Sequence, residues 1–401
     1  MREGQHRSLV SGVRQRAMIV ALALCFVGAL GGLPAPPSSA QTFTVLHSFT
    51  GTPDGANPYS SLVRDASGNL YGTTYFGGTG NGAVFQVNPS GTESVLYAFS
   101  GSKDGSNPNA GLILDASNNL YGTTVYTGSL GRGFGTVFRV NPSGKETVVH
   151  AFGYKDGAQP YGSVVLDSAG NLYGTTSFAG NRLFGTVFKL NSKGKATVLY
   201  SFNGKSDGST PFSGVVLDAS GNVYGTAPYG GGNCFGKGCG VVFKVTGVNH
   251  ESVLYTFAGG PNDGAVPYAG LVRDAAGNLY GATYDGGTSN FGTIFKLDPS
   301  GVETVLYNFA GTPDGAYPNA TLTLDPAGNL YGTTQFGGAT GLGSVFKVAK
   351  SGKEKVLYGF AESTNGANPM GGVILDPAGN LYGTTVAGGS SNLGVVFQLK
   401  P

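Results

Sequence analysis

One heptapeptide, G-N-L-Y-G-T-T, recurs seven times along the chain with small variations. Its tyrosines follow one another at intervals of 50 to 56 residues, and they are Tyr71, Tyr121, Tyr173, Tyr224, Tyr280, Tyr331 and Tyr382. A repeat of this period indicates an array in which each unit is one supersecondary element stacked on its neighbours. We therefore predict seven similar units, although 401 residues alone would suggest two or three domains.

Each unit contains four short runs of β-forming residues. In the first unit these runs are residues 61–65, 70–76, 83–88 and 94–99. They are rich in Val, Tyr, Phe and Thr, and clusters of Gly, Asn, Ser and Pro separate them, as in strands joined by tight turns. Since 71 Gly and 20 Pro make up 91 of 401 residues, a helical fold is disfavoured. Each unit is predicted to be a four-stranded antiparallel meander.

Both faces of such a meander are apolar, so both must be covered, in a closed β-propeller or a linear solenoid. The two ends of the chain decide between these architectures. An outer-strand motif lies at 43–49, before any complete unit, whereas the last unit stops after 395–400 without one. A strand at the start of the chain can complete the last unit only if the chain closes into a ring. The predicted fold class is therefore all-β: a seven-bladed β-propeller with four antiparallel strands per blade, in which the N-terminal strand closes the last blade.

The first forty residues differ from the rest of the chain. Four arginines precede an apolar run at 17–30, and small residues lead up to Ala40. This pattern indicates a secretory signal peptide, because the run is too short to cross a bilayer; a retained anchor is the alternative. We predict a signal peptide over 1–40, a propeller over 41–401, no membrane span after cleavage, and a secreted, extracellular or periplasmic location.

The charge balance argues against two classes of partner. Without residues 1–40 the chain has 20 basic residues (24 minus four Arg) and 21 acidic residues (22 minus one Glu), a formal net charge of −1. Such a chain lacks the electrostatic footprint of proteins that bind nucleic acid or anionic lipid. We therefore expect neither partner, and we expect a monomer.

Further motif blocks recur with the heptapeptide. The blocks D-G-x-x-P and L-V-x-D precede it, and G-x-V-F-K and V-L-Y-x-F follow it. Together they resemble the GloVer-type tandem repeat of secreted bacterial β-propeller proteins, over essentially residues 42–401. The resemblance implies an exported propeller, in some members with a C-terminal anchor of variable type, and it brings no established activity or catalytic residues. Because Pro401 directly follows a strand, we expect no such anchor here.

One rim of the predicted ring carries the variation between units, because the inter-blade connections and the loops after G-T-T meet there. The residues that follow the repeated Pro should surround the mouth of the central channel on this rim. They are Tyr59, Asn109, Tyr161, Phe212, Tyr268, Asn319 and Met370. Aromatic faces pack on sugar C–H groups, and amides and phenols satisfy hydroxyls. The leading hypothesis is a module that binds carbohydrate or a cell-surface polymer; packing between blades is the alternative role for these aromatic residues.

Charged residues that break the repeat are further functional candidates on this rim, and they include Arg132, Arg182, Lys237, Asp285 and Glu362. Of these we select Arg132, Arg182 and Asp285 as ligand-binding candidates. A polysaccharide lyase or glycosidase on the same scaffold is the second hypothesis. Glycosidases need two carboxylates roughly 5–9.5 Å apart, and the nearest candidates, Asp285 and Glu362, lie in different units. We assign no catalytic residue, cofactor or metal site, and whether the protein is an enzyme stays open. A protein-interaction scaffold is the third hypothesis.

Two sets of acidic residues follow the repeat, and we interpret both as turn residues, with cation binding as the alternative. One set opens the D-x-x-G-N turns: Asp65, Asp115, Asp167, Asp218, Asp274, Asp325 and Asp376. The other precedes Gly between the blades: Asp54, Asp104, Asp156, Asp207, Asp263 and Asp314, with Asn365 in the seventh unit. Because Asn keeps the hydrogen-bonding role without the charge, this substitution favours the structural interpretation.

Cys234 and Cys239 are the only cysteines beyond residue 40, and four residues lie between them. In an exported protein such a pair is expected to form a disulfide that staples its loop. A metal site would need further ligands, and the sequence offers none nearby.

Overall fold

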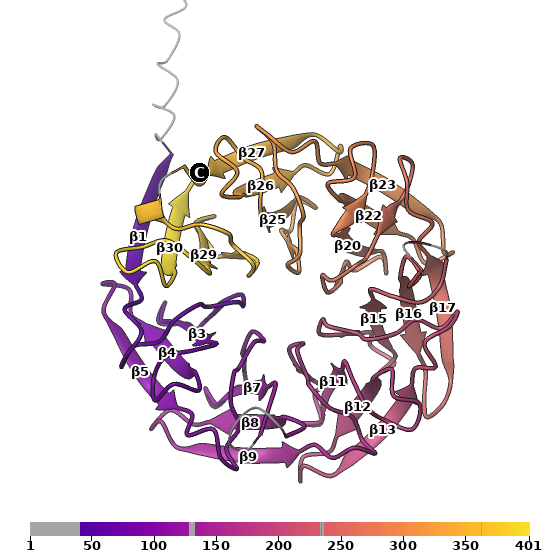
Figure 1. Ribbon diagram of the computed structural model, residues 1–401, viewed down its shortest axis with the longest axis horizontal. Helices are drawn as coiled ribbons and strands as arrows, with labels where there is room; N and C mark the ends of the chain where they lie inside the picture. The colour runs from indigo at the N-terminus through magenta and orange to yellow at the C-terminus, as the bar shows by residue number, and fades with distance from the viewer. Residues whose placement is uncertain (1–40, 128–132, 233, 235, 362) are drawn as a thin grey trace, which may run out of the picture. The chain divides into compact units, whose positions relative to one another are not determined.

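The computed structural model describes residues 41–127, 133–232, 234, 236–361 and 363–401. Residues 41–401 form one compact unit, in which seven four-stranded antiparallel sheets stand around a central axis (Figure 1). The predicted all-β, seven-bladed propeller is therefore confirmed. The predicted signal peptide lies outside the described residues. We number the blades 1 to 7 in chain order, and the strands of each blade run from the axis outward.

The strands of blades 1 to 4 are nearly identical in length from blade to blade. Blade 1 contains β2 (Val63–Arg64), β3 (Leu70–Thr74), β4 (Ala83–Val87) and β5 (Glu93–Ala98). Blade 2 contains β6 (Ile113–Leu114), β7 (Leu120–Thr124), β8 (Thr136–Val140) and β9 (Glu146–Ala151). Blade 3 contains β10 (Val165–Leu166), β11 (Leu172–Thr176), β12 (Thr186–Leu190) and β13 (Ala196–Ser201). Blade 4 contains β14 (Val216–Leu217), β15 (Val223–Ala227), β16 (Val241–Val245) and β17 (Glu251–Thr256).

Blades 5 to 7 repeat this pattern, with a two-stranded addition on blade 5 formed by β18 (Gly264–Ala265) and β21 (Asp285–Gly286). Blade 5 contains β19 (Val272–Arg273), β20 (Leu279–Thr283), β22 (Thr293–Leu297) and β23 (Glu303–Asn308). Blade 6 contains β24 (Thr323–Leu324), β25 (Leu330–Thr334), β26 (Ser344–Val348) and β27 (Glu354–Gly359), and the 3-10 turn η1 (Ser363–Asn365) follows it. Blade 7 contains β28 (Ile374–Leu375), β29 (Leu381–Thr385), β30 (Val395–Lys400) and β1 (Thr42–Ser48).

Blade 7 draws its strands from both ends of the described chain. Strand β1 pairs antiparallel with β30, with Thr42 opposite Lys400 and Ser48 opposite Val395. The two ends therefore lie side by side in one sheet, where indigo meets yellow in Figure 1. The side chain of Phe49, just after β1, packs edge-to-face on Phe85 of blade 1, with ring centroids 5.1 Å apart.

The core between blades consists of such phenylalanine pairs, repeated around the ring. In each pair the Phe after an outer strand meets the Phe in the third strand of the next blade; Phe99 and Phe138 are an example, with centroids 5.0 Å apart. All of these rings are buried, and Phe49 and Phe138 are among those with no exposed surface. The repeated Gly of Y-G-T-T makes room for them, because a Cβ on Gly72 would lie 2.5 Å from the ring of Phe85. The motifs Y-G-T-T and V-F therefore recur together for a steric reason.

The middle residue of G-T-T joins neighbouring blades near the axis. The Thr73 hydroxyl of blade 1 donates to the Ala110 carbonyl of blade 2 at 3.1 Å, and Thr384 of blade 7 donates to the Ser60 carbonyl of blade 1 at 2.8 Å. Equivalent bonds start from Thr123, Thr175, Thr226 and Thr333. In blade 5 Ala282 occupies this position, so blade 5 has no such hydroxyl to donate across its contact region, or seam, with blade 6.

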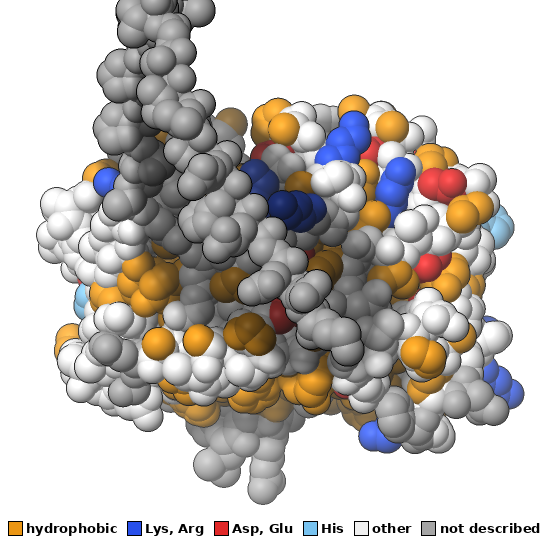
Figure 2. Space-filling model, turned by 90° about the horizontal axis from the view of Figure 1, so that it is seen from above, with side chains coloured by type: hydrophobic (Ala, Val, Ile, Leu, Met, Phe, Trp, Pro, Cys, Tyr) orange, Lys and Arg blue, Asp and Glu red, His pale blue; other side chains and the backbone are white. Residues whose placement is uncertain are grey.

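The outer side of the ring is mixed in character. Figure 2 shows hydrophobic side chains dispersed among polar ones over one side of the molecule, with few charged residues, as expected from a charged content of 11%. Within the described part of the chain, no helix is long and apolar enough to cross a membrane.

Candidate functional site

A left-handed backbone turn brings each inner strand to the axis. Two residues before each mouth residue, the chain has a positive φ: 55° at Asn57 and 57° at Val266, for example. At Asn57 the turn is held by the preceding blade, because its backbone N–H donates to the Leu393 carbonyl and its amide to the Val386 carbonyl, at 2.8 and 2.9 Å. Each inner strand therefore starts at a fixed position around the axis.

The inner strands surround a central cavity of about 750 Å³. Its lining forms three successive rings. The first ring contains the residues predicted to surround the mouth, Tyr59, Asn109, Tyr161, Phe212, Tyr268, Asn319 and Met370. The second contains small residues, Ser61, Gly111, Ser163, Gly214, Gly270, Thr321 and Gly372, and the third contains Ile113, Val165, Val216, Val272, Thr323 and Ile374. We call the side of the propeller that carries the first ring the mouth rim, and the side with the D-x-x-G-N turns the turn rim.

The aromatic residues of the first ring also contact one another. The ring of Phe212 lies 5.0 Å from Tyr161 and 5.6 Å from Tyr268, measured between centroids. The Tyr268 hydroxyl shares a hydrogen bond with Tyr229, and its ring packs on Tyr284 at 5.5 Å. These aromatic side chains can therefore pack against one another and still line the cavity, because each remains half-buried in the cavity wall.

The cavity is neutral. No Asp, Glu, Lys, Arg or His is among the described residues that line it. In the lining, burial together with a hydrogen bond to Tyr126 raises the pKa of Tyr161. Beside the cavity, burial, with the nearby Tyr126 and Tyr59, raises the pKa of Tyr75 to about 12. Burial and the bond to Tyr229 likewise raise the pKa of Tyr268. These phenols stay protonated at neutral pH and can donate or accept hydrogen bonds without carrying charge.

The predicted charged candidates lie outside the cavity lining. Arg132 and Glu362 fall outside the described residues. Arg182 is exposed in the loop between β11 and β12. Asp285 lies in β21 opposite Ala265, close to Tyr268 and Tyr284, and burial raises the pKa of its carboxyl group. The structure therefore brings together the six aromatic and amide candidates, places Asp285 beside them, and does not bring Arg182 into the cavity.

The acids of the turn rim are occupied by their own turns. Each accepts an Asn side-chain amide at 2.7–2.8 Å and a Tyr hydroxyl at 3.0–3.3 Å; in blade 1 these belong to Asp65, Asn69 and Tyr71. Burial opposes ionisation of Asp65, but these hydrogen bonds outweigh it and lower its pKa. The turns use these carboxylates structurally.

The acids between the blades bind the ends of the outer strands. Asp104 accepts the Tyr97 hydroxyl at 2.9 Å, and the histidines that replace this Tyr elsewhere pair in the same way: His47 with Asp54 at 3.1 Å and His150 with Asp156 at 2.8 Å. Within the described residues, no group of three or more His, Cys, Asp or Glu side chains is arranged to hold a metal ion.

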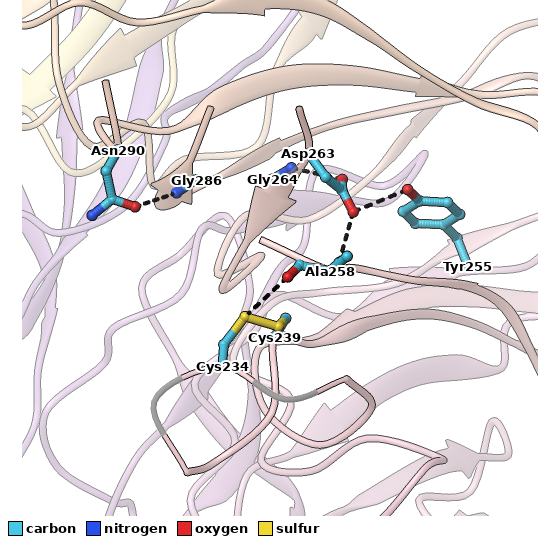
Figure 3. The surroundings of a disulfide bond; sticks show 8 residues. All are labelled: Cys234, Cys239, Tyr255, Ala258, Asp263, Gly264, Gly286 and Asn290. Atoms are coloured by element: carbon cyan, nitrogen blue, oxygen red, sulfur yellow. Dashed lines mark hydrogen bonds between the residues drawn. A yellow bond between two sulfur atoms is a disulfide. The ribbon is translucent and has the colours of Figure 1, made fainter. Parts of the chain in front are cut away.

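The predicted disulfide between Cys234 and Cys239 is present, with Cα atoms 4.8 Å apart. It lies against the connection from blade 4 to blade 5, because Sγ of Cys234 is 3.5 Å from the carbonyl oxygen of Ala258 (Figure 3). Asp263, in the same region, accepts hydrogen bonds from the Tyr255 hydroxyl and the Ala258 N–H at 3.0 and 2.7 Å.

Sequence reasoning missed the small second ring of the cavity. Its members, such as Ser61 and Gly111, stand two positions after the mouth residues in every unit. Their constant spacing from the mouth residues could have identified them, since extended segments, like strands, place residues two apart on the same side.

The fold and the cavity together define an all-β, seven-bladed propeller with a neutral, aromatic-lined central cavity. The chain belongs to the Gloeobacter/Verrucomicrobia repeat family, whose model matches residues 36–237 and 233–401. No curated protein matches the sequence.

Solved structures share the fold at low sequence identity. Virginiamycin B lyase from Staphylococcus aureus aligns with a TM-score of 0.58 and 13% identity, over 90% of this chain and 99% of that one. The extracellular domain of a protein described as a hybrid two-component system of B. thetaiotaomicron aligns with a TM-score of 0.57 and 15% identity, over 90% of this chain and 42% of that one. At such identities the likeness concerns the fold alone.

Proposed function

We propose that the protein is an exported binding module that takes up part of a neutral carbohydrate in its central cavity. The supporting observation is the first ring of the cavity, where four aromatic and two asparagine side chains, with Met370, surround a neutral opening. Ring faces match the C–H groups of a sugar, and phenols and amides match its hydroxyls. The Cys234–Cys239 disulfide agrees with export, because disulfides persist in oxidising compartments.

The lining favours binding over catalysis. General acid–base chemistry is most often performed by His, Asp, Glu or Lys with a pKa near the working pH. The described lining offers phenols instead, and the pKa values of Tyr161 and Tyr268 are raised away from neutrality. A carbohydrate that enters the cavity is therefore expected to leave unchanged.

The test uses the purified protein and a panel of neutral oligosaccharides. Titration calorimetry measures the affinity, because the 21 Tyr of the chain are spread over the whole propeller and their fluorescence would not single out the mouth. Tyr59→Ala and Tyr161→Ala should weaken binding, whereas the matched control Tyr154→Ala should not, since Tyr154 is 50% exposed and does not line the cavity. Equal affinity in all three variants would contradict the proposal, and chemical change of the bound sugar would replace it with an enzymatic function.

We also propose that β1 is what closes the ring and keeps the cavity intact. Its pairing with β30 and the Phe49–Phe85 contact support this role. A chain that begins after residue 49 leaves one edge of β30 and the face of Phe85 uncovered. It should lose cooperative thermal unfolding, and retention of a sharp transition would refute the role of β1.

A further inference from the structure

A second concave site lies on the mouth rim, above blade 4 and its connection from blade 3. Its volume is about 730 Å³, close to that of the central cavity. Most of the lining comes from the loop that contains Phe184, the connection that contains Lys205, and the loop after β15 that contains Tyr229 and Lys237; Thr256 at the end of β17 completes it. This last loop carries the insertion that makes the fourth repeat the longest.

Backbone hydrogen bonds hold the two lysines in place. The N–H groups of Gly230 and Gly231 donate to the carbonyls of Lys237 and Lys205, at 2.8 and 2.7 Å. Two consecutive glycines therefore position the backbones of two lysines that are 32 positions apart in sequence. Gly230 has a φ of 75°, and a Cβ there would lie 2.6 Å from the Lys205 carbonyl oxygen, so the arrangement requires glycine.

The site is positive. Both Lys205 and Lys237 are exposed, and no acidic side chain is among the described residues that line the site. The nearest carboxylate in the connection, Asp207, is only 5% exposed and already accepts the Tyr200 hydroxyl and the Asn203 N–H at 2.9 and 2.8 Å. Neither lysine forms a salt bridge with an acid within the described part of the chain. Both ammonium groups are therefore available to a ligand.

Tyr229 connects this site to the central cavity. Its ring lines the second site, where the Lys237 ammonium lies 5.5 Å from the ring centroid. Its hydroxyl shares a hydrogen bond with Tyr268, which lines the central cavity. A single extended ligand can therefore contact both sites across these two tyrosines.

We propose that the site over blade 4 binds the carboxylate of an acidic sugar within the same glycan whose neutral part enters the central cavity. Two ammonium groups and the glycine-rich backbone would receive the anion, and the ring of Tyr229 would pack on the adjoining sugar face. This inference rests on the proposed function, since it assumes that the mouth rim binds carbohydrate.

The test compares a partly methyl-esterified oligogalacturonate, which carries both acidic and neutral units, with its fully methyl-esterified, neutral form of equal length, at low and high salt. The unmodified protein should bind the acidic glycan about tenfold more tightly at low salt, and high salt should reduce the difference. The double variant Lys205→Ala/Lys237→Ala should bind both glycans equally. The matched control Lys244→Ala should keep the preference, because Lys244 lies over Tyr224 of the same blade at 5.4 Å but does not line the site.

Other outcomes separate the two proposals. If the neutral glycan binds as tightly as the acidic one in the unmodified protein, the inference about blade 4 fails and the proposed function survives. If neither glycan binds, both fail. Equally tight, lysine-dependent binding of a DNA oligonucleotide would indicate plain charge attraction and overturn the assignment to a sugar acid. A Cys234→Ser/Cys239→Ser variant provides a second test, because loosening the loop should reduce the acidic preference more than neutral binding.

Discussion

The two rims of the propeller are built from the same repeats and yet differ in almost every respect. On the turn rim, seven short turns use the same Asp, Asn and Tyr contacts, with nearly constant distances. On the mouth rim, the equivalent positions carry Tyr, Asn, Phe or Met, and the loops differ in length. The difference teaches that the chain separates tasks: the turn rim maintains the fold, and the mouth rim presents a surface that can differ from blade to blade.

The largest effect should come from breaking one turn of the turn rim. Asp167→Ala leaves the Asn171 N–H, the Asn171 amide and the Tyr173 hydroxyl without their acceptor. Loss of these charge-assisted bonds should lower the free energy of unfolding by about 2 kcal/mol. Urea unfolding measures it, with Asp167→Asn as the milder control. Lost glycan binding at unchanged stability would contradict the separation of tasks.

A mouth-rim substitution should have the opposite profile. Phe212→Ala removes the ring that contacts both Tyr161 and Tyr268. Glycan affinity should fall by about tenfold, equivalent to about 1.4 kcal/mol, while stability falls less than in Asp167→Ala. Calorimetry on the folded variant measures the affinity. The control is Phe336→Ala, which removes a 38% exposed aromatic ring outside the cavity lining and should leave affinity unchanged.

The seams between blades offer an intermediate test. Thr384→Val removes the hydroxyl that donates to the Ser60 carbonyl across the seam of blades 7 and 1, and should cost about 1 kcal/mol of stability. Ala282→Thr should restore to blade 5 the hydroxyl that the other blades have, and raise the melting temperature. If Ala282→Thr destabilises the protein, the seam of blade 5 has been packed around the smaller side chain.

The smallest single effect concerns pH. Burial, with the nearby Asp263 carboxylate, raises the pKa of Glu303 to about 7. Four other outer-strand glutamates have their pKa raised to about 7 in the same way, each beside one inter-blade aspartate. These pairs are Glu93 with Asp54, Glu146 with Asp104, Glu251 with Asp207, and Glu354 with Asp314. Because the folded-state pKa exceeds the unfolded value, stability should decrease as pH rises from about 4.5 through 7. The turn-rim aspartates, such as Asp65 and Asp167, have lowered pKa values. Their contribution to the free energy of unfolding is therefore lost only when the pH falls below the ordinary pKa range of Asp.

Glu303→Gln tests this dependence at one seam. It should raise the melting temperature slightly at pH 8 and reduce the pH dependence between pH 5 and 8, because the uncharged amide needs no proton. The seam between blades 6 and 7 should not contribute to this pH dependence, because Asn365 replaces the inter-blade acid there. At that seam Phe43 stacks on Tyr358, with ring centroids 4.0 Å apart. A melting temperature that rises steadily from pH 5 to 8 in the unmodified protein would contradict the sign of the prediction.

Much of the fold and of the cavity mouth could be predicted because the same sequence motifs recur seven times. Periodicity identified the meander, and the position of residues 43–49 suggested a closed ring. The mouth residues could be located because each follows a repeated Pro at the start of an inner strand, such as Pro58 before Tyr59. Local turn chemistry explained the aspartates, because an Asp that opens a D-x-x-G-N turn finds its donors within six residues.

The sequence by itself therefore determined the blade count, the strands, the turns and the ring of residues at the mouth, since these depend on contacts within one unit or on its regular repetition. Only the tertiary structure decided which side chains meet across blades. It placed Phe212 between Tyr161 and Tyr268 and put Asp285 beside the cavity rather than in its lining. It also brought the backbones of Lys205 and Lys237 to two neighbouring glycines. Such contacts join residues tens of positions apart, and their geometry depends on how closely the blades pack around the axis.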